Sequence, residues 1–326
     1  MKSVNQIRMS AILMAAIFLF AGCEKEIDDT ADNPPVAASI NSAIIPMTSG
    51  PGSSGGSGTD GIPTTRAAGT AWAADDAIGI TATHADGTTL LENAHYLTPG
   101  GDGTFTAEDG SVFYFTDNAE VGFTAYYPWT APEKLKNGII QDVLTGATNQ
   151  TPANQPKIDF LFATAKGSGA NPDVKLQFRH CMSRVVLRFL PGEGIAALDD
   201  ITFSLNGTEL YGTFNTLTGE AKALNTGSTY EIPLTVPGNA AAELSSPLIL
   251  FPQQGDDVRT LQLIMRGTKY TATFRLPQNP QGDVRELLAG HSYTYNVKIN
   301  NTTMTISQAT ISDWSDGGSE NITSTN

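Results

Sequence analysis

The sequence predicts an all-β fold, and three observations support this prediction. Apolar and polar residues alternate at every second position in several segments, as side chains do along a half-buried strand. Apolar spacing at the helical period is almost absent after the first apolar run. Only 16% of the residues are charged, and the 32 glycines, with many Thr, Ser and Asn residues, suit turns between short strands.

The first residues have the pattern of a secretory signal peptide, with Lys2 and Arg8 ahead of an apolar run at 12–21. This run has about half the length that a bilayer-spanning helix needs, so it predicts a cleaved signal at 1–22 rather than an anchor. The Gly-Cys pair that ends at Cys23 resembles the bacterial lipoprotein signal. There, Cys23 would carry lipid, such as palmitate, and begin the mature chain. The alternative is ordinary cleavage nearby, which would leave Cys23 unmodified.

Residues 23–66 are predicted to form a lipidated leader. An acidic run at 24–29 resembles the export signal that sends lipoproteins to the outer surface in Bacteroidetes. This resemblance implies a surface-exposed protein that is held in the cell outer membrane by its lipid.

The leader also contains a predicted strand at 35–46, which the Gly/Ser-rich segment 49–61 joins to the remaining chain. The side chains of 49–61 cannot build a core, so a strand on this tether can leave its sheet without pulling the rest of its domain. Arg66 follows the tether and is the only Lys or Arg between Glu26 and Glu133. One isolated cation therefore ends a flexible, otherwise neutral-to-acidic segment.

After the leader, the alternation predicts short strands separated by turn residues. In 121–129, alternate residues are apolar until Pro128 ends the strand. Modest helical patterns occur only near 132–137 and 283–289. The predicted strands are, in order, 78–82, 121–129, 174–178, 184–190, a hairpin at 261–276 that turns at Gly267-Thr268, 292–300 and 303–314.

Short strands at this spacing indicate antiparallel β-sandwiches. The mature length suffices for two domains of ordinary size. We therefore expect an N-terminal β-sandwich domain at 67–175 and a C-terminal one at 176–326, with the boundary somewhere in 170–195.

Charge and cysteine content exclude some classes of function. Without residues 1–22 the chain carries 17 basic and 33 acidic residues, a net charge of −16. Such a chain repels phosphate backbones, so we expect no nucleic-acid partner. With Cys23 committed to lipid, Cys181 stands alone and no intrachain disulfide can form. The fold must therefore depend on its hydrophobic core.

No constellation of catalytic or metal-binding residues stands out, so we expect no enzyme activity, no metal and no cofactor. The four histidines, His84, His95, His180 and His291, lack metal-ligand spacing to one another. His180 and Cys181 are adjacent on a predicted strand, so their side chains point to opposite faces and cannot share a proton. The pair Asp75-Asp76 could suggest calcium or acid/base work, but its place before a strand favours a turn.

Aromatic residues offer one possible binding feature. Surface lipoproteins often bind glycans through aromatic side chains, and the candidates here are Trp72, Trp129 and Tyr126. The place of Trp129 after Tyr127-Pro128 favours packing in the core and a turn instead.

Six segments, in order, resemble those of the fimbrillin-like proteins, the type V pilin superfamily of Bacteroidales. They are TRA followed by W and DDAIGI (65–80), AYYPW (125–129), DFLFATA (159–165), FRHCMSRVVLRF (178–189), LILFPQQ (248–254) and the closing stretch 290–314 that ends in ISDW. The resemblance implies two transthyretin-like antiparallel β-sandwich domains in tandem. It also implies a structural or accessory subunit of a surface fimbria with a role in adhesion.

The same resemblance implies an assembly mechanism. An arginine-specific protease would cut between Arg66 and Ala67 and remove the leader with its first strand, which contains Ala37, Ile40 and Ile44. The vacated groove would then accept a strand from another fimbrial subunit, either a second copy or a different protein. In such strand addition, backbone hydrogen bonds supply affinity and alternating side chains supply specificity.

The best candidate for the donor strand lies near the C-terminus and contains Met304, Ile306 and Ile311. The tail after Trp314 has one apolar residue, Ile322, and is a poor groove filler. This weakness leaves room for a tip, accessory or anchor role in place of a stalk subunit.

Two alternatives stay open at the level of the sequence. The protein could be an uncleaved fimbrial anchor or tip subunit, in which Arg66 is an ordinary loop cation. It could instead be a monomeric surface lipoprotein that binds a glycan or another ligand on a host or bacterial surface. A third hypothesis, that the protein is a hydrolase, has no support, because no set of catalytic residues stands out in the sequence.

Overall fold

The computed structural model describes residues 34–45, 71–108, 110–224, 234–279 and 282–314. Within these residues the protein is all-β, as predicted. Contrary to expectation, the sheets are not wholly antiparallel, because β2 (Ser39–Ile44) runs parallel to β11 (Asp173–His180) and β12 (Ser183–Pro191) runs parallel to β22 (His291–Ile299). Three short 3₁₀ helices accompany the strands: η1 (Pro132–Lys134), η2 (Ala147–Asn149) and η3 (Gln155–Lys157). No helix in this part of the chain is long and apolar enough to cross a membrane.

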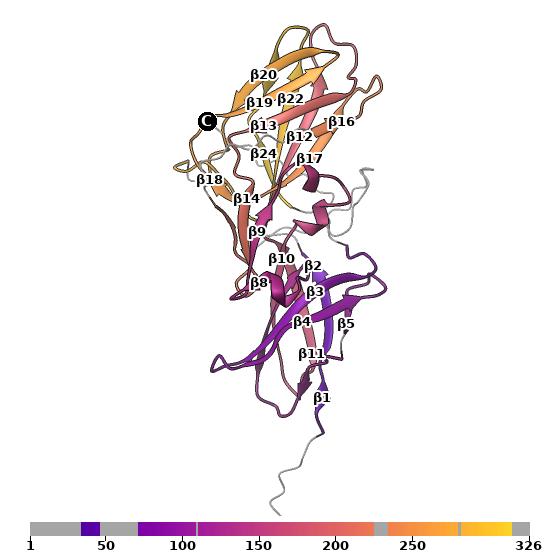
Figure 1. The fold of residues 1–326 in the computed structure, drawn as a ribbon, viewed down its shortest axis with the longest axis vertical. Coiled ribbons are helices and arrows are strands. Elements are labelled where there is room, and N and C mark those ends of the chain that lie inside the picture. The colour runs from indigo at the N-terminus through magenta and orange to yellow at the C-terminus, as the bar shows by residue number, and fades with distance from the viewer. Residues whose placement is uncertain (1–33, 46–70, 109, 225–233, 280–281, 315–326) are drawn as a thin grey trace, which may run out of the picture. The chain divides into compact units, whose positions relative to one another are not determined.

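Seven strands close into a barrel in the first half of the described chain (Figure 1). In hydrogen-bonding order they are β10 (Leu161–Gly167), β11 (Asp173–His180), β2 (Ser39–Ile44), β5 (Thr104–Ala107), β4 (Thr89–Thr98), β3 (Asp76–His84) and β7 (Val121–Tyr127), which pairs back with β10. Two further strands, β1 (Val36–Ala37) and β6 (Tyr114–Phe115), pair with each other. Strict alternation drives this packing: Val174, Leu176 and Phe178 of β11 are buried, and the residues between them are exposed.

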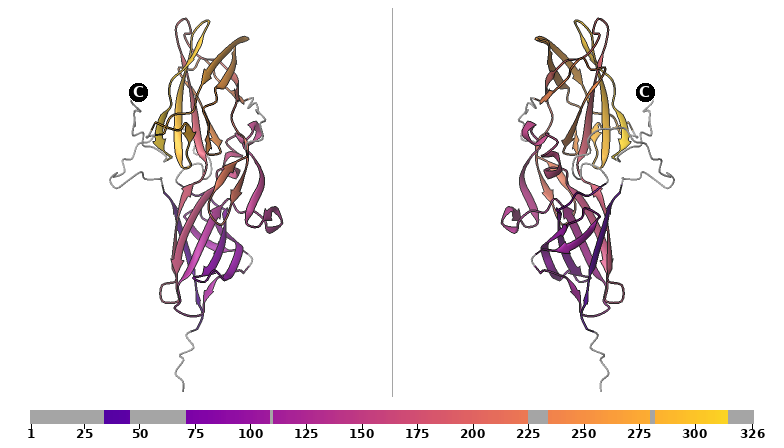
Figure 2. Two further views of the ribbon diagram at one scale, coloured as in Figure 1. Left: turned by 90° about the vertical axis from the view of Figure 1, so that its left-hand side faces the viewer. Right: turned by 90° about the vertical axis from the view of Figure 1, so that its right-hand side faces the viewer.

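Two facing sheets build the second half of the described chain, and Figure 2 shows them as separate layers. One contains β17 (Leu244–Leu250), β12 (Ser183–Pro191), β22 (His291–Ile299), β23 (Met304–Ile306) and β24 (Thr310–Asp313). The other contains β16 (Leu234–Val236), β13 (Ile201–Asn206), β19 (Arg259–Met265) and β20 (Thr268–Phe274). Their inward faces share one hydrophobic cluster, which includes Phe189, Phe203, Tyr293 and Tyr295.

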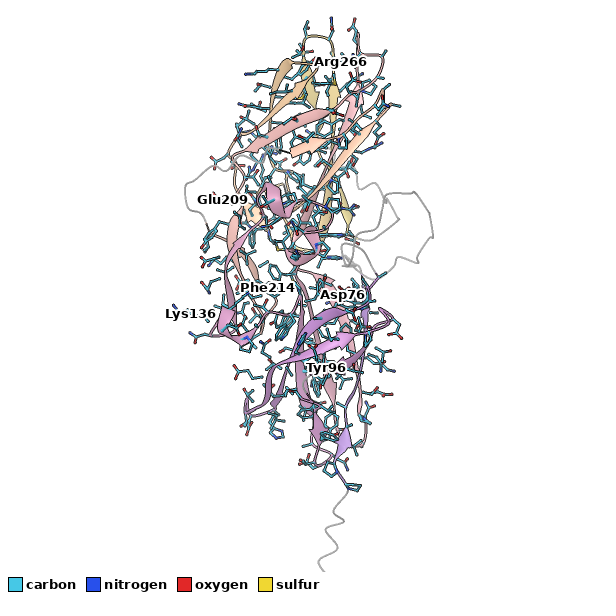
Figure 3. The ribbon with its side chains drawn as sticks, turned by 45° about the vertical axis from the view of Figure 1, so that its right-hand side comes forward. Asp76, Tyr96, Lys136, Glu209, Phe214 and Arg266 are labelled. Carbon is cyan, nitrogen blue, oxygen red and sulfur yellow. The ribbon has the colours of Figure 1, made fainter. Side chains whose placement is uncertain are left out.

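A third sheet joins segments that are far apart in the sequence. It contains β15 (Ala221–Ala223), β14 (Tyr211–Asn215), β9 (Ile139–Leu144) and β8 (Leu135–Lys136), in that order. Phe214 of β14 is labelled in Figure 3. Its ring stacks on that of Phe160, with centroids 4.4 Å apart. Both belong to a hydrophobic cluster that also includes Tyr126, Phe251 and Trp314. A last pair of short strands is β18 (Gln253–Gln254) and β21 (Glu286–Leu287).

Most predicted elements are present, with three differences. The helix expected near 283–289 is wrong, because Glu286 and Leu287 pair with β18 and form β21. The helix expected near 132–137 is reduced to η1 followed by β8. The hairpin at 261–276 turns one residue earlier than predicted, at Arg266 and Gly267, which both have positive φ as a tight hairpin turn requires.

Candidate strand-exchange site

The predicted leader strand at 35–46 forms β1 and β2, and β2 is a full member of the barrel (Figure 1). It lies between β11, to which it runs parallel, and β5, to which it runs antiparallel. All six residues of β2 are in register with β11, from the pair Ser39–Asp173 to the pair Ile44–Phe178. The amide of Ile45 continues this ladder by donating to the carbonyl oxygen of Phe178 at 2.8 Å.

The inward face of β2 carries the side chains that complete the barrel core. Ile40 is 2% exposed and Ile44 is 6% exposed, and both belong to the hydrophobic cluster inside the barrel. Ala38, two residues before Ile40, packs against the same cluster. Ala37, which is predicted to belong to the displaced strand, is exposed and pairs with Tyr114 in the β1–β6 ladder.

Ser42 lies between the two isoleucines on this inward face, because side chains alternate along a strand. Its backbone amide donates to the carbonyl oxygen of Gly103 at 2.8 Å, and its hydroxyl donates to the same oxygen at 3.3 Å. Gly103 has φ +84°, and a Cβ atom on it would lie 2.4 Å from the carbonyl oxygen of Ser42. A glycine is therefore needed for the backbone at Gly103 to approach β2 this closely.

Trp72 packs beside this contact and comes from the chain that follows Arg66. Its ring makes edge contacts with Phe105 and Phe178, each with centroids 5.2 Å apart, and with Tyr127 at 5.6 Å. Cδ1 of Trp72 would lie 3.3 Å from a Cβ atom on Gly103. Trp72 is thus a half-buried aromatic that packs against the barrel core, which argues against its role as a glycan platform.

Three predicted site residues, Cys23, Arg66 and Ala67, lie outside the described residues. Their lipidation and cleavage stay predictions. The described chain does place β2 before Arg66 in the sequence and its neighbours β5 and β11 after it. One cut after Arg66 would therefore leave β2 held to the barrel by non-covalent contacts alone.

The candidate donor residues lie at an edge of the five-stranded sheet. Met304 and Ile306 are in β23 and Ile311 is in β24, and both strands pair with β22 only. Met304 is buried in the core of the second half, and Ile306 and Ile311 are half-buried against it. Edge strands have one neighbour to leave, so they are the strands that a subunit can release at the lowest cost.

A buried cluster of Asp159, His180 and Trp314 was not predicted from the sequence. Nδ1 of His180 lies 3.0 Å from Oδ1 of Asp159, and the two side chains are 1% and 0% exposed. The His180 ring stacks on Trp314 with centroids 4.0 Å apart and planes 5° from parallel. Trp314 directly follows β24, and its amide donates to the carbonyl oxygen of Gly290 at 2.9 Å.

This cluster fixes the end of the C-terminal strands to the end of the barrel strand β11. A signal for it was present in the sequence, since Asp159, His180 and Trp314 belong to three of the segments that resemble the fimbrillin-like pattern. Periodicity cannot show that these three distant segments meet.

The described residues offer no catalytic dyad at His180 and Cys181. His180 bonds to Asp159, whereas the Cys181 thiol makes only a weak contact of 3.7 Å with the carbonyl oxygen of Arg179. Burial, with a smaller contribution from the charge of Asp159, raises the pKa of the Cys181 thiol far above its ordinary value. The thiol therefore stays protonated and is a poor nucleophile.

The pair Asp75-Asp76 forms a turn, as its place before a strand predicts. Asp75 has φ 65°, and Oδ2 of Asp76 accepts from the amide of Ala73 at 2.7 Å. Oδ1 of Asp76 accepts from the hydroxyl of Tyr127 at 3.2 Å. Figure 3 shows Asp76 at the start of β3. Among the described residues no group of three His, Cys, Asp or Glu side chains could hold a metal ion.

The other two candidate glycan-binding aromatics also have internal partners. Tyr126 is 2% exposed, and its hydroxyl donates to Oδ1 of Asn93 at 2.7 Å. Trp129 stacks on His95 at 3.8 Å, and its indole N–H donates to the carbonyl oxygen of Asn93 at 3.4 Å. Of the two, only Trp129 is half-buried rather than buried.

Comparison with known proteins identifies relatives over most of the chain. The model of a family described as "Fimbrillin-like" matches residues 65–314. A Bacteroides uniformis protein named "Putative fimbrium subunit Fim1C" is 30% identical over 263 residues, which is 78% of this chain and 82% of that protein.

Two crystal structures have a similar fold. One is a "putative cell adhesion protein" from Bacteroides ovatus, with a TM-score of 0.68 and 29% identity over 86% of this chain and 98% of the other. The second, of the same description, is from Bacteroides uniformis and has a TM-score of 0.63 and 22% identity over 86% of this chain and 99% of the other.

Proposed function

Because the chain belongs to the fimbrillin-like family, we propose that it is a structural or accessory subunit of a type V cell-surface fimbria with a role in adhesion. Its partners are other fimbrial subunits. Its role is structural rather than catalytic, which the buried, protonated thiol of Cys181 and the internally bonded His180 support.

The mature chain consists of two transthyretin-like β-sandwich domains in tandem, and the boundary that the sequence puts in 170–195 lies after β11, so that this strand belongs to the first domain. Two separate hydrophobic clusters support this division, one inside the barrel and one between the two facing sheets, whereas a third cluster and the sheet of β8, β9, β14 and β15 combine residues from both sides of it. The break between β11 and β12 falls at the residues Cys181 and Met182.

The protein reaches the surface as a lipoprotein. Residues 1–22 direct export, Cys23 carries the lipid, and the leader 23–66 holds the chain at the outer membrane until it is cut. The motifs at 12–23 and 24–29 support this step.

Maturation opens the groove that β2 occupies. An arginine-specific protease cuts after Arg66, β1 and β2 leave with the lipid, and Ala67 becomes the first residue. The observation that supports this proposal most strongly is the position of β2, which fills the space between β11 and β5. Only the chain segment on its C-terminal side, which contains Arg66, joins β2 covalently to the other barrel strands. A strand from another subunit then fills the space.

The donor strand of this subunit is β23 with β24, which contain Met304, Ile306 and Ile311. Their place at a sheet edge supports release, whereas the burial of Trp314 opposes it. Since Trp314 is 1% exposed and stacks on His180, a second candidate is a tip or anchor subunit that keeps its C-terminal strands in place.

Two variants at Arg66 test the proposed function in cells. Arg66→Ala should remove this protein from the detergent-resistant ladder of a fimbrial preparation and leave it lipidated at the membrane. Arg66→Lys keeps the positive charge but not the arginine, so it should fail in the same way. Normal ladders from either variant would contradict maturation at Arg66.

A further inference from the structure

The inward face of β2 has a size pattern that defines what can replace it. Two large aliphatic side chains, Ile40 and Ile44, are buried four residues apart. Ser42 between them is small, and Ala38 before them is small as well. A replacement strand would contact the same two neighbouring strands, because β5 and β11 follow Arg66 in the chain and stay in the mature protein.

The small residue at position 42 has a structural cause. Ser42 faces the backbone of Gly103 through the two hydrogen bonds to its carbonyl oxygen. Trp72 touches Phe105, the Cα partner of Ile40, and also Phe178, the Cα partner of Ile44. The half-buried indole therefore packs against the core at the level of Ser42. A large side chain there would collide with Trp72 or push the strand away from Gly103.

We infer that this groove accepts a strand with two large aliphatic residues four positions apart and a small residue midway, and that it rejects the chain's own C-terminal strand. The inference rests on the proposed function, because it concerns the groove that opens when β2 leaves. It identifies the partner as a strand of a different subunit rather than the C-terminal strand of a second copy of this chain.

The sequence of the candidate donor strand supports the second part of this inference, that the groove rejects the chain's own C-terminal strand. In 302–314, TTMTISQATISDW, the residue four places after Met304 is Gln308, and the residue four places after Ile306 is Thr310. Ile311 has Ser307 four places before it. No register therefore sets two aliphatic side chains at the positions of Ile40 and Ile44. The required order of side chains, large, small and large, is the same in both strand directions. Insertion of the C-terminal strand in the opposite direction therefore fails as well.

Each available register also places a polar side chain against an apolar wall. With Met304 at position 40, Gln308 would occupy the place of Ile44, and Ile306 would meet Gly103 and Trp72. A buried amide or hydroxyl without a hydrogen-bond partner is costly, and each lost aliphatic contact weakens binding about tenfold or more. Strand insertion in which a copy of this chain serves as donor is thus disfavoured at two positions at once.

Peptide exchange into the nicked protein tests this inference. The full exported chain is cut at Arg66 by limited digestion with an arginine-specific protease, so that the leader fragment stays bound. Labelled peptides are then added, and displacement of the leader fragment is followed by native mass spectrometry. The two main peptides are the leader strand 35–45 (PVAASINSAII) and the C-terminal strand 302–312 (TTMTISQATIS).

We expect the leader peptide to exchange and the C-terminal peptide to bind at least about tenfold more weakly. A leader peptide with Ser42→Leu should lose affinity by a similar factor. Its matched control is Ala43→Leu, which adds the same side chain on the exposed face and should bind like the unmodified peptide.

The outcomes separate this inference from the proposed function. If the C-terminal peptide or the Ser42→Leu peptide binds as tightly as the leader peptide, the size pattern is wrong, while exchange at this groove still stands. If even the leader peptide cannot replace its own fragment after the cut, the groove does not exchange strands, and both proposals fail.

Discussion

The amide of Ser42 donates to the carbonyl oxygen of Gly103 at 2.8 Å, and a Cβ atom on Gly103 would lie 2.4 Å from the carbonyl oxygen of Ser42. This contact joins the strand that precedes Arg66 to the barrel that follows it. It gives the first prediction.

Gly103→Ala should lower the free energy of unfolding of the full chain by roughly 2–4 kcal/mol, because it combines backbone strain at positive φ with a collision against β2. Gly87→Ala is the matched control, since Gly87 has φ +88° and nothing within 4 Å of its Cβ position. It should cost only about 1 kcal/mol. Urea denaturation measures both, and equal losses would mean that the Ser42 contact contributes nothing.

The burial of Ile40 gives a second prediction. Ile40→Ala should destabilise the full chain by about 2–5 kcal/mol, because it leaves a cavity in the barrel core. Ile264 also lies in a strand but is 43% exposed, so Ile264→Ala is the control and should cost about 0.5 kcal/mol or less. A loss at Ile40 no larger than that at Ile264 would show that β2 does not complete the core.

The stack of Trp314 on His180 gives a third prediction. Trp314→Ala should cost about 3–5 kcal/mol and loosen β24, because it removes a large buried ring at the end of that strand. Trp314→Phe keeps an aromatic ring against His180 and should cost less. Amide hydrogen exchange reports the position of the effect: the amides of β24 should exchange faster in Trp314→Ala, whereas those of β20 in the opposite sheet should change little.

Uniformly faster exchange over the whole C-terminal half would contradict a local anchor. It would show that Trp314 supports the general core and does not control the release of β24 in particular.

Alkaline pH should destabilise the protein through its buried tyrosines. Burial raises the pKa of Tyr126 from the ordinary value of 10.0 to about 12. The unfolded state therefore loses the Tyr126 proton first, so the stability from this group is complete below pH 10 and is lost as the pH rises towards 12. Burial raises the pKa of Tyr293 to about 12 as well, which adds to the loss in the same window.

Urea denaturation at pH 9 and at pH 11.5 tests whether the free energy of unfolding falls as the pH rises, and a variant of Tyr126 tests whether this residue contributes to the fall. Tyr126→Phe should reduce the loss of stability between these two pH values, by about 1–2 kcal/mol. Tyr114→Phe is the control at a tyrosine that is 51% exposed, and it should reduce the loss of stability less than Tyr126→Phe does. Identical pH profiles for Tyr126→Phe and the wild type would contradict the assignment.

The strands could be predicted from the sequence because their alternation is local. In β12, Val185, Leu187 and Phe189 are buried and the residues between them are not. The helix at 283–289 was predicted wrongly, since the apolar residues at 287 and 288 mimic part of a helical face. Pairing with β18 decides the conformation of Glu286 and Leu287 instead.

The pairing of β2 with β11 could not be predicted, because it depends on residues far apart in the sequence. Alternation shows that Ile40 and Ile44 share a face, but it does not show which strand lies beside them. The cluster of Asp159, His180 and Trp314 could not be predicted for the same reason. Each residue belongs to a recognisable segment, and only the fold brings the three together. The need for a small side chain at position 42 likewise depends on its neighbours in the fold, Gly103 and Trp72.

The N-terminal residue and intact mass of the protein recovered from the cell surface test the central claim most directly. Maturation by strand release predicts a chain that begins at Ala67 and carries no lipid, with β1 and β2 absent. A chain that begins at a lipidated Cys23 would contradict it. The first strand would then stay between β5 and β11, and the protein would serve as an anchor or as a monomeric surface lipoprotein.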